Sequence, residues 1–491
     1  MKKLLIALFA CSSIAGYAQQ KNTLLDQAFW KNSPDVNTVK AEIQKGADPA
    51  QLNPMSFDPV VMAINSGAPQ QTIEFLLAQP GNTVDKLTHD GRTYLHWAAN
   101  RGNVEIMEYL VSKGAKADVI DSHGSTPLNF AAGGGQVNTK IYEICIANGA
   151  NLKKDLNHDG ANALLLAVAN DKDLTLTNYF VSKGLDLKST DAAGNNAFSY
   201  AARGGNIEVL KALLQKGVPA NPTAMLMAAQ GSRRGANSIE VYKYLESLNI
   251  KPNVTGKNGQ NALHSVVRRP KQDEIVTYFL SKGVDVNQAD EDGNTVFMNA
   301  AASNPDTTTL ALLVPKVKNI NQANQKGTTA LAFAVRGNSP AVVSYLLSKG
   351  ADVNVSDRNG DNLAAYLVQS YSPRTAADFD TKIKILQDKE LKLNAPQQNG
   401  NTLYHLAVAK NDLALVKKLE AYQIDVNAKN KEGITALHKA AMIAKDDSML
   451  KYLISIGAKK DIVTSFDETA FDLAGENESL SKNNVTVNFL K

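Results

Sequence analysis

Side chains able to act as nucleophiles, general bases or metal ligands do not fall into any recognisable catalytic pattern in this sequence. The chain has no H-E-x-x-H, no paired C-x-x-C, no G-x-S-x-G and no phosphate loop that ends in Gly-Lys-Ser or Gly-Lys-Thr. The run Gly133-Gly134-Gly135 could cradle a phosphate, but its place between two expected helices favours an ordinary loop. Cys145 lies in the apolar stretch 141–147, where we expect it to be buried rather than reactive. We therefore predict that the chain is not an enzyme and requires no cofactor.

The histidines fall into two sets that differ in their surroundings. One set shares a position shortly after an expected helix start, and we expect its rings to hydrogen-bond the backbone of a neighbouring turn; it comprises His96, His264, His405 and His438. His89, His123 and His158 instead lie within two residues of a glycine. They could form a row of metal-binding or proton-sensitive side chains, or they are solvated turn residues. Neighbouring helices pack about 8–10 Å apart, which is long for sharing one zinc ion with bonds of about 2 Å. We predict no metal site.

The first eighteen residues have the pattern of a secretory leader. Lys2 and Lys3 precede the apolar run 4–10, and small residues lead to Ala18, after which we expect cleavage. The run is much shorter than the roughly 18 apolar residues of a membrane-spanning helix, and no later stretch approaches that length. Alternatively, Cys11 is the lipidated first residue of a lipoprotein. We expect export to the periplasm or the cell exterior, with no membrane span.

Charge and cysteine content add little about partners but constrain stability. Loss of Lys2 and Lys3 with the leader lowers the formal charge from +4 to +2, which gives no indication of nucleic acid or an anionic membrane as a partner. Loss of Cys11 leaves one cysteine, so the mature monomer cannot form an internal disulfide. An exported protein without disulfides must gain its stability from burial.

One glycine recurs along most of the chain at intervals of 33 to 40 residues, apart from one interval of 65 that is nearly two periods. Its positions are Gly91, Gly124, Gly160, Gly194, Gly259, Gly293, Gly327, Gly360, Gly400 and Gly433. A repeat of this length indicates stacked supersecondary units, each of which buries its apolar face against the next.

The residues around these glycines repeat as well. They read G-S-T-P-L-N-F-A-A from Gly124 and G-I-T-A-L-H-K-A-A from Gly433. The second helix and its exit also fit the repeat, as in the segment 342–354, which ends in K-G-A-D-V-N. Over roughly residues 22–475, the sequence resembles the ankyrin pattern G-x-T-P-L-H-x-A-A. The resemblance implies an all-α solenoid of about thirteen helix-turn-helix repeats with short β-hairpin tips in a curved superhelical stack. This solenoid would cover residues 19–475, followed by a C-terminal cap or tail at 476–491.

Residue types within the repeat fit this architecture physically. Threonines stand where a helix N-cap is needed, at Thr93, Thr126, Thr295, Thr329, Thr402 and Thr435. Glycines follow the second helix as C-terminal caps, at Gly114, Gly149, Gly184, Gly217, Gly283, Gly350 and Gly457.

Two units depart from the pattern, near residues 218–250 and 361–391. The first has Pro219 and Pro222 where a tip is expected, followed by an inserted basic loop at 231–237. The second replaces Ala-Ala with Leu367-Val368 and inserts residues 370–375 between its helices. We expect these units to change the curvature of one continuous solenoid, because no polar Pro/Gly/Ser linker separates the blocks.

The resemblance also implies where a partner would bind, at the hairpin tips and the exposed ends of the first helices on the concave side. Basic residues recur there or in the inserted loop, at Arg92, Arg101, Arg203, Arg233, Arg234, Arg268, Arg269, Arg336 and Lys410. Such a stripe would bind an acidic protein surface through bidentate pairs with carboxylates. Alternatively, these residues only complement the negative ends of helix dipoles.

We therefore predict a monomeric, non-enzymatic scaffold that presents a concave groove to a protein partner. A secreted effector or inhibitor of a foreign protein is the alternative, followed by a small-ligand receptor or an enzyme that uses the irregular repeats. The fold alone does not distinguish these functions.

Overall fold

The computed structural model describes residues 22–232 and 235–491. The expected leader at 1–18, Arg233 and Arg234 lie outside the described residues. Contacts divide the chain into two compact units, residues 1–224 and residues 225–491, here named unit 1 and unit 2.

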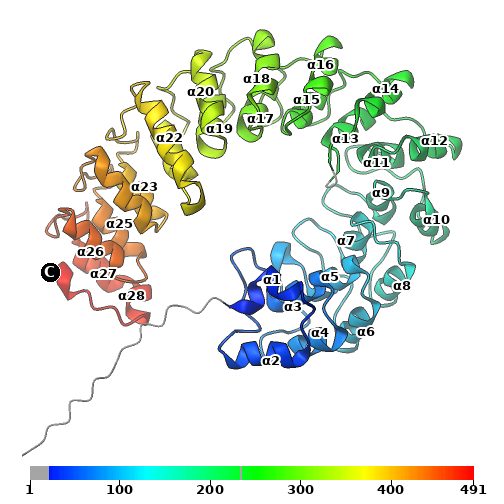
Figure 1. Cartoon of the computed structure of the whole chain (residues 1–491), viewed down its shortest axis with the longest axis horizontal. Coiled ribbons are helices and arrows are strands. Elements are labelled where there is room, and N and C mark those ends of the chain that lie inside the picture. The colour runs from blue at the N-terminus through cyan, green and yellow to red at the C-terminus, as the bar shows by residue number, and fades with distance from the viewer. Residues whose placement is uncertain (1–21, 233–234) are drawn as a thin grey trace, which may run out of the picture. The chain divides into compact units, whose positions relative to one another are not determined.

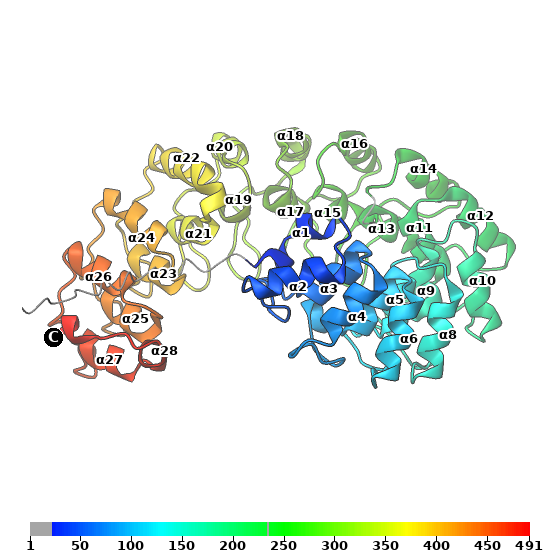
Figure 2. The ribbon, with the colours of Figure 1, turned by 60° about the horizontal axis from the view of Figure 1, so that its bottom comes forward.

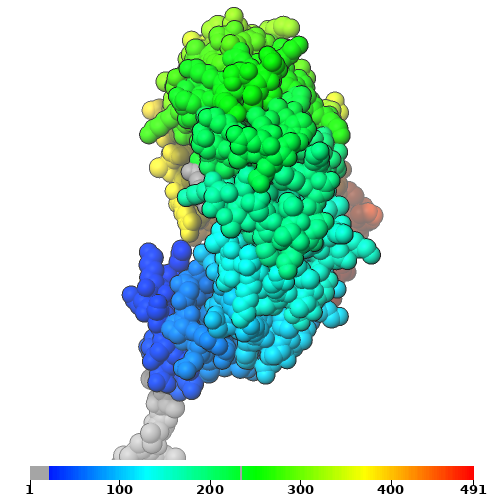
Figure 3. All heavy atoms as spheres, turned by 90° about the vertical axis from the view of Figure 1, so that its right-hand side faces the viewer, coloured from blue at the N-terminus to red at the C-terminus, as the bar shows by residue number. Residues whose placement is uncertain are grey.

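Unit 1 consists of helix pairs stacked side by side, so that the first helices form one row and the second helices another (Figures 1 and 2). The first helices are α1 (Gln27–Trp30), α3 (Pro59–Ser66), α5 (Tyr94–Arg101), α7 (Pro127–Gly133), α9 (Ala163–Val168) and α11 (Ala197–Gly204). The second helices are α2 (Val36–Gln44), α4 (Gln70–Leu77), α6 (Val104–Ser112), α8 (Thr139–Ala147), α10 (Thr175–Ser182) and α12 (Ile207–Gln215). In the space-filling view, side chains of α8, α10 and α12 cover one face of this unit continuously (Figure 3).

Unit 2 repeats the same two-row arrangement, and its first helix begins at the division between the units. The first helices are α13 (Ala224–Gln230), α15 (Ala262–Val266), α17 (Val296–Ser303), α19 (Ala330–Gly337), α21 (Leu363–Ser370), α23 (Leu403–Ala409), α25 (Ala436–Ile443) and α27 (Ala470–Glu476). The second helices are α14 (Ile239–Ser247), α16 (Asp273–Ser281), α18 (Thr307–Leu313), α20 (Pro340–Ser348), α22 (Ala376–Gln387), α24 (Leu413–Leu419), α26 (Ser448–Ser455) and α28 (Glu478–Lys482).

Short 3₁₀ turns and single-residue bridges complete the helix pairs. The 3₁₀ turns are η1 (Thr23–Leu25), η2 (His89–Gly91), η3 (Val314–Lys316), η4 (Pro373–Thr375), η5 (Glu420–Tyr422) and η6 (Asn488–Leu490). Single antiparallel bridges close several hairpin tips, including Thr190 with Asn196, Ala323 with Thr329 and Val463 with Thr469. The predicted all-α fold of stacked helix pairs is confirmed. Residues 476–491 hold α28 and η6, whose Leu480 and Leu490 are buried.

The first helices begin where the threonine pattern predicts. Thr126, Thr295 and Thr329 are N-caps whose hydroxyls accept the backbone N–H three residues later. The buried alanines Ala98 and Ala99 have no exposed surface, which lets adjacent first helices approach closely.

In four repeats, a histidine at the third helical position joins the repeat to the next one. His96 Nδ1 accepts the Thr93 backbone N–H at 3.2 Å, and its Nε2 lies 3.1 Å from the Ser125 carbonyl of the following tip. Since Nδ1 accepts, the ring is neutral and donates its Nε2 proton to that carbonyl. The rings of His264, His405 and His438 bond the carbonyls of Asn294, Ile434 and Ile462 in the same way. This confirms the predicted role of the four histidines.

Asparagine side chains close the C-terminal ends of the first helices. Asn338 Nδ2 donates to the carbonyls of Ala301 and Asn304 in the preceding repeat, each at 2.8 Å. Asn304 and Asn477 make equivalent pairs of bonds to the repeats before them. Each first helix in these repeats therefore has its orphan carbonyls satisfied only when the next repeat is in place.

Lysines replace these asparagines around the irregular pair of α21 and α22. Lys382 on α22 donates to the Val335 carbonyl at 2.9 Å, the position that Ala301 holds in the preceding repeat. Lys410 donates to the carbonyls of Val368, Gln369 and Tyr371 at 3.0–3.2 Å and so caps the end of α21. The hydrogen bond to the carbonyl near the end of the preceding first helix therefore comes here from the longer second helix α22. In the repeats with Asn304, Asn338 and Asn477, a residue that follows a first helix donates it.

We predict that the stability of unit 1 decreases on acidification through His96. Burial lowers the pKa of His96 to about 4, although its bond to Ser125 opposes the shift. Because the fold favours the neutral ring, this contribution is complete above the unfolded pKa of about 6.5 and is lost as the pH falls towards 4. The loss is roughly 3 kcal/mol at pH 4. Urea unfolding between pH 7 and pH 4 measures this. The variant H96Q should lose this part of the pH dependence, whereas H123Q, at an exposed tip, should retain it.

We predict that removing the Asn338 amide destabilises unit 2 by about 1–3 kcal/mol, because two helix carbonyls lose their donor. The comparison is N338A against N354A, since Asn354 is exposed on the same unit. Chemical unfolding of both variants is the measurement, and N354A should stay within about 0.5 kcal/mol of the parent protein. Equal stability of the two variants would contradict the proposed capping role.

Candidate partner-binding surface

Backbone hydrogen bonds join successive hairpin tips within each unit. In unit 2, Gln325 N donates to Asp292 O at 3.0 Å, and Arg358 N donates to Lys326 O at 2.9 Å. Gly327 shows why this position requires glycine: its φ is +80°, and a Cβ there would lie 2.7 Å from Arg358 N. The tips therefore form a preordered row and not a set of independent loops.

Side chains also hold each tip against its own first helix. Asp357 closes its turn by accepting the Asp361 N–H at 3.0 Å, and its other oxygen accepts the Tyr366 hydroxyl of α21 at 2.9 Å. In unit 1, Tyr200 of α11 donates to Asp191 at the same distance. A partner would therefore meet tips whose positions are fixed before it binds.

The structure places Arg92 differently from the prediction. Its side chain is buried, with Nε 2.9 Å from Asp121 and Nη1 3.0 Å from Asp90. The guanidinium also lies 4.1 Å from the centre of the Phe130 ring. Because both its charge and its flat face are satisfied inside the repeat, Arg92 holds two tips together and does not present a charge to a partner.

The other predicted residues of unit 1 lie on the surface. Arg101 is exposed at the end of α5 and donates to Asn65 Oδ1 at 3.0 Å. Arg203 is exposed near the end of α11. Arg101 forms no ion pair with a carboxylate of the described residues, and Arg203 has contacts within the chain.

In unit 2, some of the predicted basic residues are available to a partner, whereas others bond backbone carbonyls of the chain itself. Arg268 and Arg336 are exposed and occupy the same place near the ends of α15 and α19; Arg268 donates to Asn299 at 3.1 Å. Arg269 is half-buried and donates to the Gln230 carbonyl at 2.9 Å. Lys410 serves as the helix cap described above. The structure therefore leaves Arg268 and Arg336 as the best-placed cations of this unit.

Sequence reasoning missed two apolar features of unit 1, a largely buried aromatic row and a set of exposed aliphatic side chains. Phe57, Trp97 and Phe130 form an aromatic row with ring centres 5.5–5.6 Å apart. Aliphatic side chains just before four successive tips are also exposed by 43–59%; these are Leu52, Leu87, Ile120 and Leu156. The signal was present, because Trp97 and Phe130 hold one repeat position in adjacent repeats, as do Leu87 and Ile120.

Two of the three tip histidines, His89 and His123, lie beside a carboxylate. His89 and His123 each place Nε2 3.4 Å from Asp90 Oδ2, and the His89 ring stacks on Phe57 with centres 4.5 Å apart. Partial burial opposes the shift, but the charges of Arg92 and the two imidazoles hold the pKa of Asp90 below its usual range. Residues 22–232 and 235–491 contain no group of three or more His, Cys, Asp or Glu side chains arranged to hold a metal ion.

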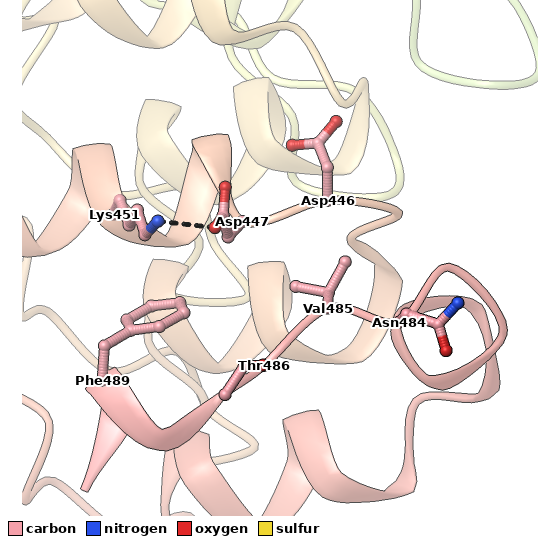
Figure 4. A pocket seen from close by; sticks show the side chains of 7 residues that line it. All are labelled: Asp446, Asp447, Lys451, Asn484, Val485, Thr486 and Phe489. Carbon is pink, nitrogen blue, oxygen red and sulfur yellow. Dashed lines mark ion pairs between the residues drawn. The ribbon is translucent and has the colours of Figure 1, made fainter. Parts of the chain in front are cut away.

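Surface pockets occur at several places in unit 2. One, of about 560 Å³, lies between the start of α26 and the C-terminal segment (Figure 4). Its Lys451 is paired with Asp447 at 2.6 Å and lies 5.4 Å from the Phe489 ring, so its charge is neutralised locally. This arrangement attaches the C-terminal segment to α26.

Cys145 on α8 has no exposed surface. Burial raises the pKa of its thiol to about 12, which keeps it protonated and unreactive near neutral pH. The predicted packing role is confirmed. In the part of the chain that the structure describes, no helix has both the length and the hydropathy required to cross a bilayer.

Comparisons with known proteins agree with this architecture. A family model described as "Ankyrin repeats (3 copies)" matches residues 25–121, 60–155, 138–224, 164–256, 200–290, 263–357, 374–464 and 404–487. The chain is 22% identical over 468 residues to the E3 ubiquitin-protein ligase KEG of Arabidopsis thaliana, covering 88% of this chain and 28% of that protein. It is also 22% identical over 442 residues to the human transient receptor potential cation channel subfamily A member 1, covering 89% and 33%.

A shorter match is closer in sequence. A putative ankyrin repeat protein of Rickettsia bellii is 31% identical over 131 residues, which cover 27% of this chain and 70% of that protein. The chain spans about a third or less of the two longer relatives above, so their activities belong to those whole proteins. Because the family model matches most of the chain in overlapping segments, this protein belongs to the ankyrin-repeat family.

Proposed function

We propose that this protein is a non-enzymatic, monomeric scaffold that binds a partner protein with its hairpin tips and the adjoining ends of its first helices. Ankyrin repeats imply a protein-interaction scaffold, and this supports the general assignment. The observation that carries the specific proposal is the backbone bonding between tips, such as Arg358 N to Lys326 O. A surface ordered in advance avoids the entropy loss that a flexible binder incurs on association.

The exposed cations of unit 2 favour a partner with an acidic surface. Arg268 and Arg336 sit at the same place in alternate repeats, and neither is paired with a carboxylate in the described part of the chain. Arginine side chains bind carboxylates through two parallel hydrogen bonds, which gives direction as well as attraction. These two residues are therefore the central contacts of the proposal.

We expect the double variant R268E/R336E to bind an acidic partner at least about tenfold more weakly at low salt, because two attractive contacts become repulsive. The partner is first identified by cross-linking and mass spectrometry in the native compartment, and its affinity is then measured by calorimetry. The matched control is K316E/K349E, which changes the net charge equally at exposed ends of the second-helix row. Equal binding by R268E/R336E and the parent protein would exclude this surface.

We also propose that the protein acts outside the cytoplasm, on the grounds of the leader pattern ahead of Ala18. Mass spectrometry of the chain recovered from periplasm or culture fluid should find Gln19 as its first residue. A lipid-modified Cys11 as the first residue would instead support the lipoprotein alternative.

A further inference from the structure

A cavity of about 360 Å³ lies in unit 2 where the irregular pair α21–α22 meets the preceding repeat. Its walls come from the end of α19, the start of α20 and the first turns of α22; these helices lie beside one another in Figure 1. Arg336, Ser339, Thr375, Asp378 and Lys382 line it. Two cations thus face a single carboxylate around one hollow.

Lys382 is an unusual wall residue because its side chain is almost fully buried, with 4% of its surface exposed. An ammonium group carries three N–H donors, and the Val335 carbonyl is the one acceptor recorded for Lys382 among the described residues. Burial lowers the pKa of Lys382, and the nearby Asp378 opposes the shift. A buried cation with donors to spare gains stability from an anion placed in contact with it.

Arg336 supplies the second cation from the opposite wall. Its guanidinium lies over the rings of Phe333 and Tyr366, at 5.3 and 6.0 Å from their centres. In the described residues it has no recorded hydrogen bond or ion pair, so its planar set of N–H donors is available. A cation near aromatic ring faces is stabilised without use of its N–H groups, which stay able to make a bidentate contact.

Two helix starts add to the positive character of the cavity. Ser339, the N-cap of α20, and Thr375, at the start of α22, both line it. The Thr375 side chain does not cap α22, whose first turn carries Asp378, and backbone N–H groups at a helix start favour negative charge.

We infer that this cavity binds one carboxylate, presented by a Glu or Asp side chain of a protein partner. The inference rests on the proposed scaffold function and names the group that the partner inserts. A volume of about 360 Å³ admits such a side chain and falls at the small end of ligand pockets. The charged lining of two cations and one carboxylate has a net charge of +1, which one singly charged carboxylate neutralises.

The test uses the full mature chain and the blocked amino acid acetyl-Glu-amide, which carries one carboxylate. At constant ionic strength it should raise the unfolding temperature in a saturable manner, whereas the neutral acetyl-Gln-amide should not. The variant R336Q should weaken binding at least about tenfold, and R358Q, at an exposed tip of the same unit, should bind like the parent protein. K382M, which removes the buried cation, should also weaken the binding of acetyl-Glu-amide.

Three results would overturn the inference: no saturable effect of acetyl-Glu-amide, an equal effect in R336Q, or tighter binding of acetyl-phosphoserine-amide. These outcomes are separable from failure of the scaffold proposal. If R268E/R336E loses its partner while acetyl-Glu-amide does not bind, the scaffold stands and the carboxylate site is wrong. If acetyl-Glu-amide binds but the partner is retained by R268E/R336E, the cavity binds a carboxylate that this partner does not supply, and both the inserted group and the proposed partner surface are wrong.

Discussion

The C-terminal end of a first helix leaves carbonyl groups that its own repeat does not satisfy, and the next repeat supplies the missing donors. Asn338 bonds two such carbonyls of the preceding repeat, while His96 bonds the tip of the following one. Helix pairs that carry such residues are therefore completed by bonds to their neighbours. This dependence explains why no repeat needs a closed core of its own, and why order passes along the row of tips.

The same constraint explains the irregular pair of unit 2. The insertion between α21 and α22 removes the loop asparagine that would cap α19, and Lys382 takes its place from α22. A lysine reaches further than an asparagine, so α22 need not approach α19 as closely as a normal loop does. The space left between these elements is the cavity that Arg336 and Lys382 line. Irregularity and a binding site thus have one physical origin.

The repeat architecture was predictable from the sequence because each position has a strict local requirement. Thr126, His96 and Gly327 act through their own turn or the adjacent one, so spacing alone identifies their roles. The roles of Arg92 and Lys410 were not predictable in this way. A basic residue near a helix end looks the same in sequence whether it faces a partner, an inner carboxylate or a row of carbonyls. Only the structure distinguishes these three roles, because it places Asp121 beside Arg92 and the C-terminal end of α21 beside Lys410.

The chemical difference between the two units constrains how one scaffold could recognise its partner. Unit 1 exposes aliphatic side chains such as Leu87 and Ile120 just before its tips, where unit 2 has Ala323 and Ser356. Both units expose arginines, Arg101 and Arg203 in unit 1 and Arg268 and Arg336 in unit 2, but those of unit 2 are not accompanied by exposed aliphatic side chains at these positions. Apolar contact contributes affinity in proportion to area, whereas charged contact mainly contributes direction and association rate. A partner that engages unit 2 should therefore show stronger salt dependence than one that engages unit 1 alone, because exposed charge pairs are screened by ions and buried apolar area is not.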